Sequence, residues 1–163
     1  MIAGAALTVV VAGACQPEPA SRRVARNELV GIASVIDGDT IDIHGERIRL
    51  SGFDAPEEGR RCTDAAGAAV RVHQTTSLAL SDFIGARTVS CARAGKDNHG
   101  RTVATCSVGE VDLGSWMVEN GHARDWPKYS HGKYAPQEAR ARAARRGIWG
   151  MACPGLFDGR SLR

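Results

Sequence analysis

The residues best suited to chemistry are two aspartates at the ends of neighbouring predicted strands. Asp39 has the strand parity of Ile41, and Asp54 has the parity of Leu50, so both fall in the apolar-facing register at the same end of the sheet. Two carboxylates that point to one barrel mouth repel each other unless a proton or a cation lies between them. Oxygen ligands favour a hard cation, Ca²⁺ or Mg²⁺, so this pattern predicts a metal site.

A second interpretation of this region is turn chemistry. Asp37-Gly38-Asp39 is an ordinary turn sequence, and taken alone it is better explained in that way, because short motifs often occur without a function. Asp54 and, three residues later, Glu57 change the balance. With these acidic residues alongside, we favour the site.

The elements that must position these residues are strands first and helices later. The Asp-Gly pair between two β-rich runs indicates a hairpin. We expect strands at residues 29–36, 40–43, 47–50, 88–92 and 101–108. We expect helices from Thr63-Asp64 to Ile84, at 113–120 behind an Asp112 cap, and from Pro136 to Gly147. This order predicts an α+β fold, a five-stranded OB-type Greek-key barrel with three helices.

The chain length of 163 residues suits one domain, which we place at residues 28–149. Residues 1–14 carry no charge, are too short to span a bilayer and end in a small-residue cleavage pattern, which is typical of a secretory signal. Cys15 follows at once, as in a bacterial lipoprotein signal, where it would be acylated and attach the protein to a membrane; simple cleavage after Ala14 fits equally well. We expect a linker at 15–27, a tail at 150–163, and an extracellular, periplasmic or lipid-anchored protein.

The cysteines agree with export. If Cys15 carries a lipid, four remain, enough for two disulfides in an oxidising compartment. Cys91 and Cys106 flank a predicted hairpin symmetrically, which sets them opposite each other within bonding reach. Cys62 then pairs with Cys153 by elimination, and buried free thiols are the alternative. The net charge of +3 favours an anionic partner only weakly.

Several separated blocks of the sequence resemble one known family. They are IDGDT at 36–40, RIRLSGFDAPE at 47–57, DNHGRTVA at 97–104, GHAR at 121–124 and GIW at 147–149. The same blocks occur in the same order in the staphylococcal nuclease-like (thermonuclease) family, and the resemblance covers residues 28–149. It implies a calcium-dependent phosphodiesterase, an endonuclease that cuts DNA and RNA, single strands more readily than duplexes. We expect a monomer.

The resemblance also implies the metal ligands. By position, Asp39 and Asp54 would bind Ca²⁺, helped by the backbone carbonyl of Ala55. Relatives often have Thr at this last position, but a main-chain contact tolerates Ala. Since few protein ligands are visible, we expect a modest dissociation constant, on the order of 10⁻⁴–10⁻³ M.

The catalytic roles follow by the same resemblance. Glu57 would act on the attacking water, as a general base or by orienting it, and Arg49 and Arg101 would hold the scissile phosphate. These residue types suit the chemistry, because guanidinium groups donate paired hydrogen bonds to the phosphoryl oxygens that gain charge in the transition state.

The substrate groove departs from the family pattern. A Lys-Tyr pair is common in the family where this chain has Asn98-His99. His99 could stack on a base or simply fill a turn, and Tyr129 is the counterpart of a nucleotide-contacting tyrosine. Two other hypotheses stay open: a non-catalytic OB module on the cell envelope that binds nucleic acid, and a structural envelope lipoprotein.

Overall fold

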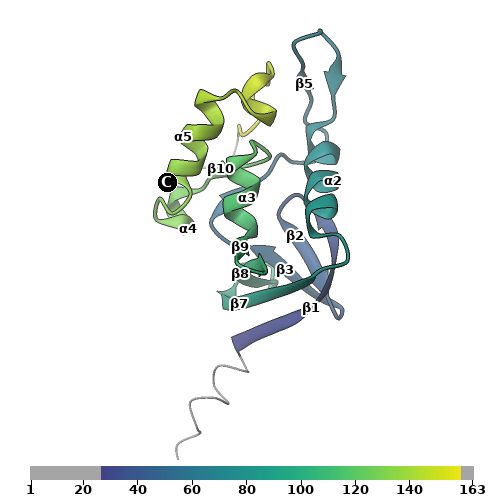
Figure 1. The fold of residues 1–163 in the computed structure, drawn as a ribbon, viewed down its shortest axis with the longest axis vertical. Helices are drawn as coiled ribbons and strands as arrows, with labels where there is room; N and C mark the ends of the chain where they lie inside the picture. Colours follow the sequence, from purple (N-terminus) through teal and green to yellow (C-terminus); the bar gives the residue numbers. More distant parts are fainter. Residues whose placement is uncertain (1–26, 159–163) are drawn as a thin grey trace, which may run out of the picture.

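The computed structural model describes residues 27–158, so the predicted signal, Cys15 and nearly all of the predicted linker lie outside the described residues. Five strands form a closed barrel at the lower end of Figure 1. They are β1 (Glu28–Asp37), β2 (Thr40–Ile43), β3 (Glu46–Leu50), β7 (Thr88–Lys96) and β8 (Thr102–Val108). Neighbours pair antiparallel except β3 and β8, whose parallel pairing closes the barrel. The predicted OB-type α+β fold is confirmed.

The barrel forms because its strands alternate between a buried and a more exposed face. In β8 every second residue is buried, from Thr102 to Val108. The inward residues of β2 and β3 include Ile41, Ile43 and Ile48, each 0% exposed. β-Branched side chains fit such a pleated interior well, so the apolar register predicted from sequence is the one that packs.

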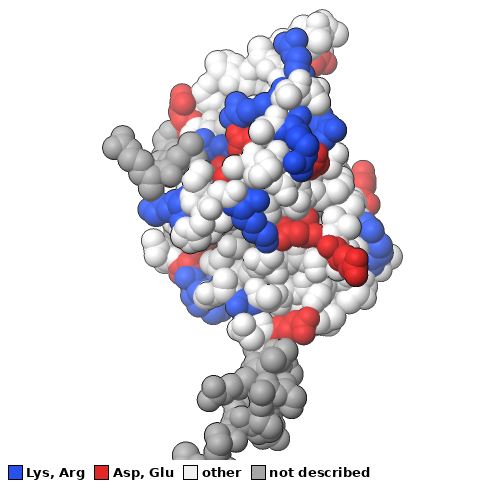
Figure 2. Space-filling model, turned by 60° about the vertical axis from the view of Figure 1, so that its left-hand side comes forward, with Lys and Arg blue, Asp and Glu red and all other residues white. Residues whose placement is uncertain are grey.

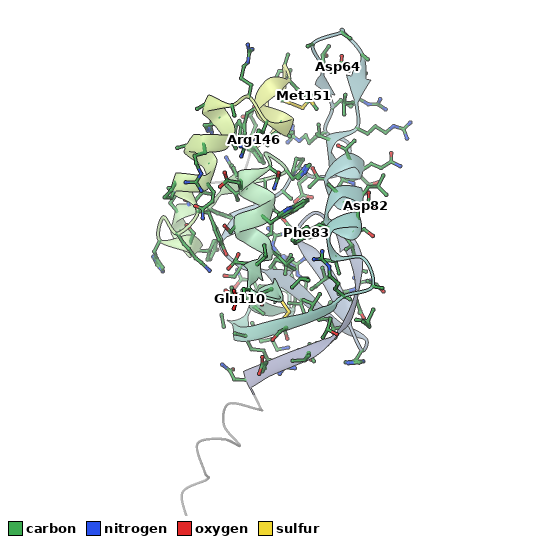
Figure 3. All side chains as sticks on the ribbon, in the orientation of Figure 1. Asp64, Asp82, Phe83, Glu110, Arg146 and Met151 are labelled. Atoms are coloured by element: carbon green, nitrogen blue, oxygen red, sulfur yellow. A yellow bond between two sulfur atoms is a disulfide. The ribbon has the colours of Figure 1, made fainter. Side chains whose placement is uncertain are left out.

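Helices cover the upper end of the barrel (Figure 1). They are α2 (Val72–Ile84), α3 (Leu113–Glu119), α4 (Pro127–Ser130), α5 (Ala135–Ala143) and the 3-10 turn η1 (Gly147–Gly150). Phe83 of α2 points towards α3 (Figure 3) and stacks on Trp116, with 4.1 Å between ring centroids. Asp112 caps α3 as predicted, accepting from the Ser115 amide at 2.8 Å. In the part of the chain that the structure covers, every helix is too short or too polar to cross a membrane.

The predicted helix start at Thr63-Asp64 is wrong. A small hairpin of β5 (Cys62–Thr63) and β6 (Ala69–Val70) stands there, and α2 begins only at Val72. The Asp64 carboxylate accepts from the amides of Ala66 and Ala68 at 2.9 and 2.8 Å. It therefore stabilises the hairpin turn, at the tip of which Figure 3 labels it, instead of a helix end. The short helix α4 was not predicted.

The segment beyond Trp149 is not a loose tail up to Asp158. Cys153 forms a disulfide with Cys62, Thr63 and Ala152 exchange backbone hydrogen bonds of 2.8 Å, and Leu156 is buried in a second small core. Its few apolar residues lacked helical or strand periodicity, so the sequence concealed this packing. The other disulfide joins Cys91 and Cys106, directly opposite each other on β7 and β8, and both pairings are as predicted.

Candidate active site

Asp39 lies at the turn between β1 and β2, with only 4% of its surface exposed. Its backbone carbonyl accepts from the Leu50 amide at 2.8 Å, which joins the start of β2 to the end of β3. The Ala55 amide donates to its Oδ2 at 3.3 Å. The carboxylate is therefore held inside the barrel mouth, against the loop that follows Asp54.

Asp54 ends the short strand β4 (Phe53–Asp54) and is fully buried. β4 pairs with β10 (Arg124–Asp125), and Arg124 stands directly opposite Asp54. The Arg124 Nε donates to Asp54 Oδ2 at 3.0 Å, and its Nη2 lies 2.9 Å from the same oxygen. This guanidinium offsets the cost of burying the Asp54 charge.

Arg49 connects the two carboxylates. It extends from β3, forms an ion pair and hydrogen bond with Asp39 Oδ1, and places its second Nη 3.9 Å from Asp54 Oδ1. The structure thus brings Asp39, Arg49, Asp54 and Ala55 together at one end of the barrel, where the strand register predicted the carboxylates to converge.

Burial controls the charge of this cluster. It raises the pKa of Asp39 from 3.8 to about 6, an effect that neighbouring Arg49 opposes. A cation beside Asp39 would restore the charged form. The two carboxylates supply hard oxygen donors of the kind that Ca²⁺ prefers. Residues 27–158 contain no group of three or more His, Cys, Asp and Glu side chains placed to hold a metal, so the remaining ligands would have to be backbone carbonyls, water or substrate oxygens.

Arg101 stands just before β8, the strand that pairs with β3. In the parallel pairing of β3 and β8, Arg49 lies opposite Val103, so Arg101 has the parity that places it on the same face as Arg49. Its Nε donates to Asp97 Oδ2 at 2.7 Å, and Asp97 Oδ1 also accepts from the Arg101 amide at 2.9 Å. Arg101 is thus fixed by its own turn rather than by the buried carboxylates.

The remaining predicted residues are exposed. Glu57 lies in the loop after β4, and His99 lies at the tip of the β7–β8 turn, where its amide donates to Asp97 Oδ1 at 2.9 Å. Tyr129 on α4 is 53% exposed and packs edge-on against Trp126, with 4.8 Å between ring centroids. These side chains lie at the surface, where a large substrate makes its contacts.

Sequence reasoning missed two residues that support the site, Arg124 and Asp97. Both stand inside the recognised blocks, GHAR and DNHGR, but nothing local identifies their partners. Arg124 and Asp54 are separated by 70 positions in the chain. Asp97 precedes Arg101 by four positions, so its spacing within the turn was the one available signal.

Charge on the surface adds little to the assignment. On the face drawn in Figure 2, blue and red side chains lie among one another, with no extended area of a single sign. The buried cluster, and not the charge on this face, therefore identifies the site.

Comparison with known proteins agrees with the fold. The family model described as staphylococcal nuclease homologue matches residues 47–151. The succinoglycan biosynthesis protein ExoI of Rhizobium meliloti (strain 1021) is 42% identical over 127 residues, which are 77% of this chain and 66% of that protein. An uncharacterized endonuclease of Haemophilus influenzae is 30% identical over 149 residues, 88% of this chain and 74% of that one.

A plant protein also matches. The probable staphylococcal-like nuclease CAN2 of Oryza sativa subsp. japonica is 30% identical over 109 residues, 66% of this chain and 27% of that protein. This chain spans about two thirds of the Rhizobium relative and about a quarter of the rice protein. Taken with the family model, which matches well over half of the sequence, these similarities show that the chain belongs to the staphylococcal nuclease homologue family.

Proposed function

We propose that this protein is an exported, calcium-dependent nuclease that hydrolyses phosphodiester bonds in DNA and RNA. The observation that carries the proposal is the cluster of Asp39, Asp54 and Arg49, two buried carboxylates joined by one guanidinium. Family membership supports it, as do the names of two relatives, an endonuclease and a staphylococcal-like nuclease.

Each residue has a role that its position allows. Asp39 and Asp54 would hold Ca²⁺, with the Ala55 carbonyl as a further oxygen ligand. The bound cation would polarise the phosphate and lower the pKa of a nearby water. Arg49 and Arg101, on one face of neighbouring strands, would bind the scissile phosphate and stabilise the charge that its oxygens gain. Glu57 would orient the attacking water or accept its proton.

Contacts beyond the scissile bond would come from exposed rings. His99 and Tyr129 are both exposed, and stacking on bases favours single strands, whose bases are unpaired. Export is supported by the two disulfides, which persist in an oxidising compartment. Export could take either of two forms, attachment through a lipidated Cys15 or simple cleavage after Ala14, and both residues lie outside the described ones.

The test is hydrolysis of heat-denatured DNA and of RNA by the purified chain, with Ca²⁺ and then with a calcium chelator. We expect cleavage only with Ca²⁺ and none from Asp39→Ala. The substitution Arg47→Gln changes an exposed strand residue outside the cluster and serves as control. A folded protein that cuts neither substrate at any Ca²⁺ concentration would refute the nuclease, and salt-dependent binding to the same DNA would then identify a non-catalytic OB module.

A further inference from the structure

We infer that a cavity between α2, β1 and the loop after Glu57 binds the part of a single-stranded nucleic acid that flanks the cleaved bond. The inference rests on the proposed function, because it extends that same site. The cavity measures about 570 Å³, within the range of small-ligand sites. None of the residues assigned above to metal binding, catalysis or base contact lines it.

The cavity adjoins the candidate active site along two segments. It is lined by Ile36, which precedes the Asp37-Gly38-Asp39 turn, and by Glu58, which follows Glu57. The turn itself packs on α2: a Cβ added at Gly38 would lie 2.5 Å from the Thr76 side chain. Ser77, the next residue of α2, lines the cavity. A single-stranded nucleic acid that leaves the active site can therefore enter this cavity directly.

Charge favours a polyanion. Arg60, Arg61 and Arg71 line the cavity, against one acidic residue, Glu58. Arg61 and Arg71 are exposed, and within residues 27–158 neither side chain forms an ion pair or hydrogen bond. Two guanidiniums without a carboxylate partner are suited to bind phosphates.

Two further features complete the site. Arg71 is the N-cap residue of α2, and no side chain caps this end of the helix. The positive end of the helix dipole therefore lies beside Arg71. Leu78 and Ile36, 55% and 45% exposed, also line the cavity and provide an apolar surface for base faces. Phosphate-binding charge beside apolar surface is the chemistry of a single-stranded nucleic acid.

The first measurement is binding of a fluorescent single-stranded DNA oligonucleotide to the full chain, with chelator present to prevent cleavage. Arg61→Gln combined with Arg71→Gln should weaken binding about tenfold. It should also make the negative slope of log affinity against log salt shallower by about 1.4, or about 0.7 for each lost phosphate contact. The matched control is Arg47→Gln with Arg145→Gln, which removes the same charge from exposed residues outside the cavity.

The apolar surface has its own test. Leu78→Ser should weaken binding of the normal strand and leave binding of an abasic strand of equal length unchanged. The inference is wrong if the Arg61→Gln/Arg71→Gln variant binds the DNA strand as its control does. It is also wrong if this variant loses affinity for anionic phospholipid vesicles but not for the DNA strand.

A cleavage assay separates this inference from the proposed function. The Arg61→Gln/Arg71→Gln variant should have a KM for a long DNA strand about tenfold above that of the unchanged protein. Its kcat/KM for a dinucleotide should be unchanged, because a dinucleotide is too short to occupy the cavity. Equal losses on both substrates would overturn the inference while leaving the nuclease intact. If no variant cleaves anything, the binding assay still decides on the cavity.

Discussion

Arg124 and Asp54 face each other on β10 and β4, and the Arg124 Nε donates to Asp54 Oδ2 at 3.0 Å. Both residues are buried, Asp54 completely. This contact joins the carboxylate of a proposed metal ligand to a segment near the C-terminal helix. Family resemblance placed Asp54 in the site, but its partner emerged only from the folded structure.

Arg124→Ala should destabilise the protein by about 3–5 kcal/mol, because it leaves the Asp54 charge buried without this guanidinium. Urea unfolding measures the loss. Arg140→Ala removes an exposed partner of Glu119 and should cost less than about 1 kcal/mol. Equal effects of the two substitutions would show that the buried pair is not a major source of stability.

The pKa of Asp39 predicts how stability depends on pH without metal. Burial raises the pKa to about 6 from 3.8, so between these values the folded state binds more protons than the unfolded state. Asp39 therefore makes stability fall as pH rises through this window, by at most about 3 kcal/mol. Asp39→Asn should remove that fall, and chemical denaturation at pH 4 and pH 7 checks it. Parallel profiles for the two proteins would contradict the raised pKa.

Asp97 should act on the reaction through Arg101, which it holds at 2.7 Å. We expect Arg101→Ala to lower kcat/KM about 10³-fold or more, as losses of arginines do in phosphoryl transfer. Arg49→Ala should have an effect of the same order, and Glu57→Gln should cost roughly 10²- to 10⁴-fold in kcat/KM.

Asp97→Asn keeps one hydrogen-bond acceptor and should lower kcat/KM much less than Asp97→Ala. If both Asp97 variants cleave normally, the turn does not position Arg101.

The two disulfides should differ in what they contribute. Cys62–Cys153 links residues 91 positions apart, and Cys91–Cys106 links residues 15 positions apart. By loop-closure entropy, replacing the first pair with serine should cost about 4–5 kcal/mol, and replacing the second about 3 kcal/mol. Thermal unfolding of the two double variants compares them. A larger loss from the shorter loop would indicate that packing, rather than chain entropy, dominates.

Local sequence determined the barrel and the place of the carboxylates. Four of the five barrel strands were predicted to within one residue at each end, whereas β7 extends to Lys96, four residues beyond its predicted end. The inward parity of Asp39 and Asp54 was readable because side chains alternate strictly across a strand. The Asp112 cap was readable for a similar reason, since a cap and its helix are adjacent in the chain. Periodicity and adjacency need no knowledge of distant residues.

Tertiary structure decided what depends on distant partners. The Asp64 carboxylate could have capped a helix, and the β5–β6 hairpin used it in a turn instead. Residues 150–158 carried no periodic pattern, yet a disulfide and a second core hold them against the domain. The Arg124–Asp54 pair arises only when strands 70 positions apart in sequence meet. The Arg49 bridge forms only when β3 folds against both the turn at Asp39 and the strand that ends at Asp54. Burial and charge pairing are properties of the assembled fold, so the sequence alone left them undetermined.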